Sequence, residues 1–404
     1  MKEKFGSVNT VSTVKIEENQ IVAFQKNASR TYSFRVYKDG FVGIHYQVGE
    51  MSDEAGYKRA EENLALKRPY PYPLATGNRK RDKCEHIYTD KELLDIAKEA
   101  LAHICEKYPQ FTLSGSFSQT TDTQSRTNDN GMDFENKDSS VHVSFSYKHK
   151  DSKNITDGYF DIGQREFSFE KLYDMADNYL GSFETQVALP EEAILQTQYY
   201  GLLGMVKGCL DAESLSLGTS LFTGKMGQKL FSEDFTLIDD CSDEECWHSV
   251  FWDGEGYVKE NDRRIFIDKG VPLLGYSDRR IAEKYNVPYT GNAWNNYTDI
   301  PSNGKVNLLI KRSPKTTKEL LDGKLSIVLD NASGGGFNEK GDYVMPVHHA
   351  FLCDGEKFLG SLPPFTLSTN MFDMFGKDFI GVGSDQPVFN DKSVLMKVKI
   401  TPNE

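Results

Sequence analysis

The chain has 404 residues, with 60 acidic and 47 basic side chains, and a net charge of −13 at pH 7. This length predicts two or three domains, and an aromatic content of 12% excludes a disordered chain. The acidic balance argues against nucleic acid or an anionic membrane as a partner, because either would require a basic face on the protein.

Other features of the sequence indicate the cellular compartment in which the protein is expected. The first residues lack the apolar stretch of a signal peptide, and no run of 18 apolar residues predicts a membrane helix. The six cysteines are spread too thinly for a secreted domain held together by disulfides. We therefore expect a cytoplasmic protein with reduced thiols.

Residues 32–46 predict a β-hairpin. Apolar side chains alternate on both sides of the turn Lys38-Asp39-Gly40. Residues 52–67 carry helix formers and are expected to pack on the hairpin. Residues 68–73, with a proline at every second position, indicate a connector.

Residues 89–108 give the strongest helix prediction. Thr89 and Glu92 have the spacing of a capping box, and the apolar residues that follow fall on one face. Pro109 ends the helix. His103 lies near the edge of the apolar face, which favours a packing or surface role.

The next segment alternates in the manner of strands. Residues 141–147 predict a half-exposed strand on which His142, with the nearby His149, faces solvent. Ser168 is then expected to cap a short helix that ends at Gly181.

A second helix is predicted to begin at Pro190-Glu191-Glu192 and to run to Val206, because proline and acidic residues favour a first helical turn. After Gly218 the chain is rich in strands and turns. We place the main boundary near residues 181–187.

Cys241, Cys246 and His248 form the densest cluster of candidate metal ligands, flanked by Asp239, Asp240 and the acidic residues 243–245. The Cys-x2-Cys spacing of a zinc knuckle is absent. An acidic exposed turn between two strands is therefore the favoured interpretation, and the role of the three residues stays open.

Two further patterns could carry chemistry. On a strand, His348 and His349 point to opposite faces, and His349 lies about 13 Å from Cys353, too far for a base and its nucleophile. A long-range partner for either group remains open. The glycine-rich residues 333–337 lack the Lys-Ser/Thr of a phosphate loop and predict a turn.

Several stretches of the C-terminal half resemble the TldD/PmbA family, once called modulators of DNA gyrase and linked to peptide maturation by proteolysis. They span about 215 residues and keep the family's order. These stretches are Val187-Ala188-Leu189-Pro190-Glu191-Glu192, Phe222-Thr223-Gly224-Lys225-Met226-Gly227-Gln228-Lys229, Thr236-Leu237-Ile238-Asp239-Asp240, Phe251-Trp252-Asp253-Gly254-Glu255-Gly256, Gly270-Val271-Pro272-Leu273-Leu274-Gly275-Tyr276 through Asp278-Arg279-Arg280-Ile281-Ala282, Thr290-Gly291-Asn292-Ala293, and Phe379-Ile380-Gly381 followed by Ser384-Asp385.

The resemblance implies a zinc site in TldD-type members, formed by His-Glu-x3-His on a helix and a cysteine near the C-terminus. The matching helix positions are Leu203, Gly204 and Gly208 in this chain, and no cysteine follows Gly381. This departure is typical of the PmbA (TldE) branch, which lacks its own metal site. It leaves open whether the chain is itself an enzyme.

The retained glycines are interpreted as backbone requirements, and Asp278, Arg279 and Asn292 as capping or turn residues. We therefore assign no catalytic, cofactor-binding or metal-binding residue to this chain. Zinc is expected only in a TldD-type partner.

The resemblance thus implies an α+β protein. An N-terminal α/β domain (residues 1–184) precedes a β-rich C-terminal domain (residues 185–404) with a large, mostly antiparallel sheet. Its function would be that of the non-metal-binding subunit of a TldD-type metallopeptidase assembly that processes or degrades peptides. The alternative is a homodimeric protein that binds peptides or ligands without catalysis. A third hypothesis, a hydrolase that uses Cys209 or Cys353, is the least favoured.

Overall fold

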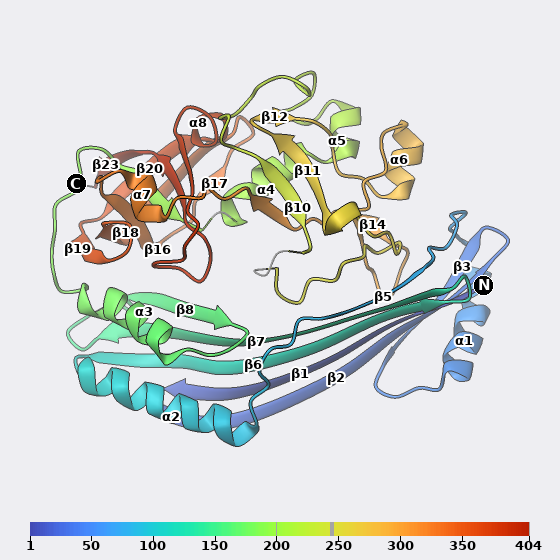
Figure 1. The fold of residues 1–404 in the computed structure, drawn as a ribbon, viewed down its shortest axis with the longest axis horizontal. Coiled ribbons are helices and arrows are strands. Elements are labelled where there is room, and N and C mark those ends of the chain that lie inside the picture. Colours follow the sequence, from blue (N-terminus) through green and yellow to red (C-terminus); the bar gives the residue numbers. More distant parts are fainter. Residues whose placement is uncertain (199, 243–245, 404) are drawn as a thin grey trace.

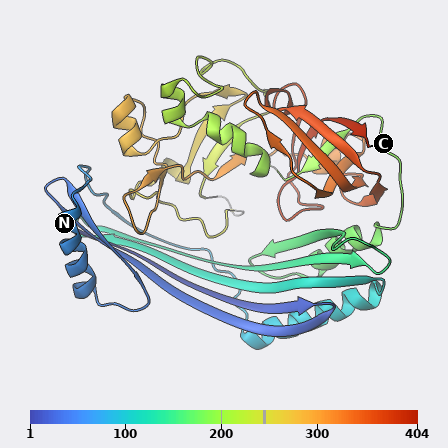
Figure 2. The ribbon, with the colours of Figure 1, turned by 180° about the vertical axis from the view of Figure 1, so that it is seen from behind.

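The structure is a computed structural model that describes residues 1–198, 200–242 and 246–403. Its N-terminal half is a long, curved sheet in the order β4-β3-β2-β1-β6-β7-β5, with β8 also paired to β7. The C-terminal half faces one side of this sheet (Figure 1), and the view from behind in Figure 2 shows the same arrangement. The α+β fold class predicted from the sequence is confirmed.

The long sheet is built from extended antiparallel strands, and only β5 pairs parallel to its neighbour. Helix α1 lies near one end of the sheet and α2 covers its outer face (Figure 1). The elements of this half are β1 (Lys2–Glu17), β2 (Gln20–Lys38), β3 (Phe41–Val48), α1 (Asp53–Glu62), β4 (Arg68–Pro69), β5 (Gly77–Asp82), α2 (Asp90–Lys107), β6 (Phe111–Asn128), β7 (Met132–His149), β8 (Gly158–Gln164) and α3 (Phe169–Gly181).

The C-terminal half contains a sheet in the order β21-β22-β9-β16-β18-β20-β23 and a smaller one in the order β12-β11-β10-β15. The larger sheet is antiparallel except where β9 pairs with β16. The elements are β9 (Ile194–Thr197), α4 (Tyr200–Cys209), α5 (Ala212–Leu217), β10 (Leu237–Asp240), β11 (Arg263–Asp268), β12 (Val271–Pro272), α6 (Arg279–Tyr285), β13 (Ala293–Trp294), β14 (Ser302–Asn303), β15 (Leu308–Ile310), α7 (Thr317–Leu321), β16 (Ser326–Ala332), β17 (Gly336–Phe337), β18 (Asp342–Cys353), β19 (Phe358–Leu362), β20 (Phe365–Asn370), α8 (Met371–Met374), β21 (Phe379–Val382), β22 (Val394–Lys397) and β23 (Lys399–Pro402).

In the N-terminal half, the helix caps and the hairpin predicted from short sequence patterns are confirmed. Thr89 and Glu92 form the capping box of α2, and Ser168 caps α3. The hairpin is β2–β3, although β2 begins well before the predicted strand. Short-range chemistry therefore sets the ends of these elements.

Two predictions are wrong. The segment expected to be a helix from Pro190 to Val206 begins with strand β9, which pairs with β16 and β22, and α4 begins only at Tyr200. The side chain of His149 is only 15% exposed and does not face open solvent, because it stacks on Phe183 and lies 3.3 Å from a Glu184 carboxylate oxygen.

One hydrophobic core joins the two halves of the chain. Apolar side chains of α2 and α3 share a cluster with Val328, Phe351 and Phe358 of the larger C-terminal sheet. Tyr179 of α3 lies 5.0 Å from Phe358 between ring centroids. The boundary between residues 184 and 185 stays a prediction. Within the described ranges, no helix is long and apolar enough to cross a membrane.

Candidate functional site

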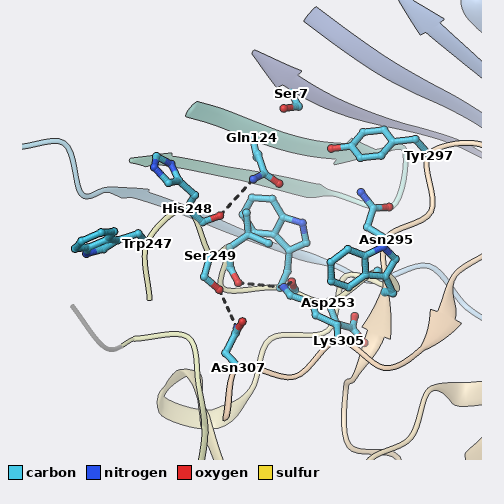
Figure 3. A pocket seen from close by; sticks show the side chains of 14 residues that line it. Ser7, Gln124, Trp247, His248, Ser249, Asp253, Asn295, Tyr297, Lys305 and Asn307 are labelled. Atoms are coloured by element: carbon cyan, nitrogen blue, oxygen red, sulfur yellow. Dashed lines mark hydrogen bonds between the residues drawn. The ribbon is translucent and has the colours of Figure 1, made fainter. Parts of the chain in front are cut away.

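A cavity of about 390 Å³ lies between the long sheet and the C-terminal half (Figure 3). Ser7 of β1 and Gln124 of β6 line it from the sheet, where they are paired across the two strands. The loop 247–254, the segment 294–297 and residues 305 and 307 line it from the C-terminal half. The cavity is thus assembled from five separate stretches of sequence.

The cavity is rich in aromatic side chains, because all three tryptophans of the chain line it. Trp252 is 4% exposed and lies 5.7 Å from Phe134 between ring centroids. Trp294, which is 59% exposed, stands at the rim. Trp247 packs on Gly163, where an added Cβ would lie 2.1 Å from the indole. These residues give the cavity an apolar wall.

Two charged side chains also line the cavity, and both are already engaged. The Lys305 ammonium donates hydrogen bonds to the main-chain oxygens of Val250 and Trp252. Burial lowers the pKa of Lys305, and the nearby Lys259 lowers it further. The Asp253 carboxylate accepts hydrogen bonds from main-chain N–H groups, which anchors the loop that carries Trp252.

A buried ion pair holds one wall of the cavity in place. Asp239 at the end of β10 is fully buried, and Lys259 Nζ lies 3.0 Å from its Oδ2. The same carboxylate accepts hydrogen bonds from Asn292 Nδ2 at 2.7 Å and from the main-chain N–H of Asn307 at 2.8 Å. Since Asn307 lines the cavity, this pair fixes one of its walls.

Among the buried carboxyl groups of this region, Glu255 has the pKa that departs most from its ordinary value. Burial raises its pKa to about 7, and the nearby Asp253 carboxylate raises it as well. The main-chain N–H of Arg279 donates to Glu255 Oε2 at 3.1 Å, and the Arg279 guanidinium lies 3.8 Å away. Glu255 is not among the residues that line the cavity, and its contact with the first residue of α6 is structural.

Cys241 and His248, two of the candidate metal ligands, are held by other partners. Cys241 is 2% exposed, and its sulfur accepts a hydrogen bond from Asn307. His248 Nε2 lies 2.9 Å from Ser140 Oγ. Within the described ranges, no group of three His, Cys, Asp or Glu side chains could hold a metal ion. The predicted residues 243–245 lie outside these ranges.

Asp239 and Asp240, which flank the predicted turn, end a strand and are buried rather than exposed. Asp239 is completely buried, and Asp240 is 7% exposed. Both belong to β10 rather than to a turn, because the strand extends two residues farther than its apolar residues suggest. Asp239 is paired with buried Lys259, and Asp240 Oδ1 accepts hydrogen bonds from the main-chain N–H and hydroxyl of Ser242, which makes burial possible.

His349 does have a long-range partner, although it is not a cysteine. Its Nδ1 lies 2.7 Å from Asp330 Oδ2, and its Nε2 lies 3.0 Å from Ser361 Oγ. Ser361 is 2% exposed and donates its hydroxyl hydrogen to the Phe183 oxygen. The arrangement resembles a hydrolase triad, but its hydroxyl is closed off from substrate. We interpret it as a contact that ties the two halves together.

The two cysteines of the hydrolase hypothesis are poor nucleophiles. Burial raises the pKa of Cys353 to about 12 and raises the pKa of Cys209. Both side chains are at most 4% exposed. A thiol must ionise and meet its substrate in order to react.

The positions that match the zinc helix lie on α4. Leu203 is buried in the core, whereas Gly204 and Gly208 face outward, and an added Cβ at either glycine would meet nothing within 4 Å. None of the three side chains can coordinate a metal or move a proton. The helix is therefore present without the ligands that the resemblance assigns to TldD-type members.

The retained family residues have structural roles. Asp278 caps α6 through the main-chain N–H of Ile281, as expected. Asn292 braces Asp239, and Arg279 braces Glu255. Sequence reasoning missed the tryptophans. Their confinement to residues 247–294, inside the resembling region, was the signal that could have found them.

Residues 192–400 match the model of the PmbA/TldA metallopeptidase C-terminal domain. The chain belongs to the TldD/PmbA family. It is similar to an uncharacterized protein of Methanocaldococcus jannaschii, with 25% identity over 90% of this chain and 87% of that protein.

Two solved structures share the fold. TldE from Thermococcus kodakarensis superposes with a TM-score of 0.81 at 17% identity, over 99% of this chain and 96% of that one. A putative modulator of a DNA gyrase from Thermotoga maritima superposes with a TM-score of 0.73 at 19% identity, over 98% and 95% of the two chains.

Proposed function

We propose that this chain is the non-metal-binding subunit of a TldD-type metallopeptidase assembly. A separate zinc subunit would cleave peptides, and this chain would hold the peptide and complete the chamber around it. The proposal rests mainly on α4, which offers Leu203, Gly204 and Gly208 where the zinc motif is expected. The likeness of the whole fold to TldE supports it.

We further propose that the assembly works in the cytoplasm and without nucleic acid. The six cysteines all lie within the described ranges and form no disulfide there, which suits a reducing compartment. The net charge of −13 disfavours binding to a phosphate backbone.

The test is reconstitution with the zinc subunit. The tagged chain is purified from its native host, and a co-purifying protein is examined for His-Glu-x3-His. Hydrolysis of an unfolded peptide is then measured for each protein alone and for the mixture. We expect hydrolysis only where the zinc subunit is present, and we expect a zinc chelator to abolish it.

Two results would contradict the proposal. A chain that purifies as a lone homodimer and binds peptide without cleaving it would favour the alternative binding protein. Peptidase activity of the purified chain that survives chelation and is lost on alkylation would favour a cysteine hydrolase instead.

A further inference from the structure

The cavity in Figure 3 has the size and lining of a side-chain pocket. Its volume of about 390 Å³ falls in the usual range for small-ligand sites. Aromatic side chains prefer stacked or edge-on contacts with other rings. The indoles of Trp252 and Trp294, together with Tyr297 (Figure 3), therefore favour a large apolar or aromatic occupant.

The charges of the cavity favour a neutral occupant. Lys305 already donates to two main-chain oxygens, and Asp253 already accepts three main-chain N–H groups. A charged side chain that entered would lose its hydration without gaining a free counter-ion from either residue. We therefore expect glutamate and lysine side chains to bind more weakly than apolar ones.

Two buried polar atoms of the lining have no hydrogen-bond partner among the described residues. They are Asn295 Oδ1 and His248 Nδ1. Both atoms are shielded from solvent, so an occupant of the cavity would not reach them without a rearrangement of the lining.

We propose that this pocket binds a large apolar or aromatic side chain of a peptide. The peptide nature of the ligand rests on the proposed function. The pocket itself belongs to this chain alone, so its binding is measurable without a partner subunit.

The experiment uses the full chain and the probes acetyl-Ala-Phe-Ala-amide, acetyl-Ala-Glu-Ala-amide and acetyl-Ala-Lys-Ala-amide. Since all three tryptophans line the pocket, indole emission excited at a wavelength that phenylalanine does not absorb reports on the pocket. We expect a saturable change with the phenylalanine peptide, and binding at least ~10-fold weaker for the two charged peptides.

Two variants test the location, with affinities measured by calorimetry. Trp294→Ala removes the exposed rim, and Ser7→Phe fills the cavity from β1, so each is expected to weaken binding by ~10-fold or more. Tyr159→Ala is the matched control, because Tyr159 is 56% exposed, similar to Trp294 at 59%, and does not line the cavity. Circular dichroism checks that each variant is folded.

Equal affinity for the three peptides, or an unchanged affinity in folded Trp294→Ala and Ser7→Phe, would overturn the proposal. If those results came with recovery of a zinc subunit, the pocket inference would fail and the proposed function would stand. If the phenylalanine peptide bound and no zinc subunit were recovered, the pocket would stand and the assembly would fail.

Discussion

Replacing Glu255 by glutamine gives the sharpest test of the buried charges near the cavity. Glu255 is 4% exposed, and its pKa is raised from 4.5 to about 7, first by burial and then by the Asp253 carboxylate. Glutamine keeps the shape and can still accept the hydrogen bond from the Arg279 main chain. The substitution thus removes the ionisable group and keeps the side-chain shape and this hydrogen bond.

The sign of the effect follows from proton binding. Between pH 4.5 and about 7 the folded chain binds a proton at Glu255 that the unfolded chain has released. The free energy of unfolding therefore falls as the pH rises through this window and levels off above it. At 1.36 kcal/mol per unit of pKa, the loss is at most about 3 kcal/mol.

The assay is urea unfolding of the wild type and Glu255→Gln at pH 4.5, 6 and 8. Relative to the wild type, we expect the variant to gain up to about 3 kcal/mol in free energy of unfolding between pH 4.5 and 8. Glu339→Gln, at an exposed glutamate, is the control and should change stability by less than ~0.5 kcal/mol at each pH. A difference between wild type and Glu255→Gln that does not vary with pH would refute the reasoning.

Three further experiments test a buried ion pair, a close main-chain contact and a buried thiol. Lys259→Met leaves the Asp239 carboxylate buried without its counter-ion, so we expect urea unfolding to show a loss of about 3–5 kcal/mol. Gly270→Ala places a Cβ 2.2 Å from a main-chain oxygen at φ +82°, whereas Gly224→Ala at φ +73° meets nothing within 4 Å. Thermal unfolding should therefore show a larger loss for Gly270→Ala than the ~1–2 kcal/mol of left-handed strain expected for its control. Because burial raises the pKa of Cys353 to about 12, iodoacetamide at pH 8 should leave this thiol unmodified in the folded chain, as mass spectrometry would show.

Much of the secondary structure could be predicted because its signals are local. Thr89 and Glu92 lie three residues apart, and both caps form within one turn of helix. Strand β9 was missed because a run of four residues carries no clear period, and its type is decided by Ile327 and Val328 of β16 far along the chain.

The candidate site could be predicted only in part. The resemblance located the loop that carries Trp252 and Asp253, and the absence of ligands on α4 could be read directly from the sequence. The cavity itself could not be predicted, because Ser7 and Gln124 reach it only after β1 and β6 have paired along almost their whole length. Long-range pairing of this kind leaves no local pattern.

Because the two halves share a core, part of that core stays uncovered while the chain is being synthesised. The apolar faces of α2 and α3 are complete by residue 181, whereas Phe351 and Phe358, which cover part of them, come much later in the chain. At ~5–20 residues per second, a ribosome needs about 10–35 s to travel from residue 181 to residue 358. During this interval the nascent N-terminal half presents an uncovered apolar surface to the cell. The order in which the chain emerges thus leaves apolar surface exposed that the finished fold covers.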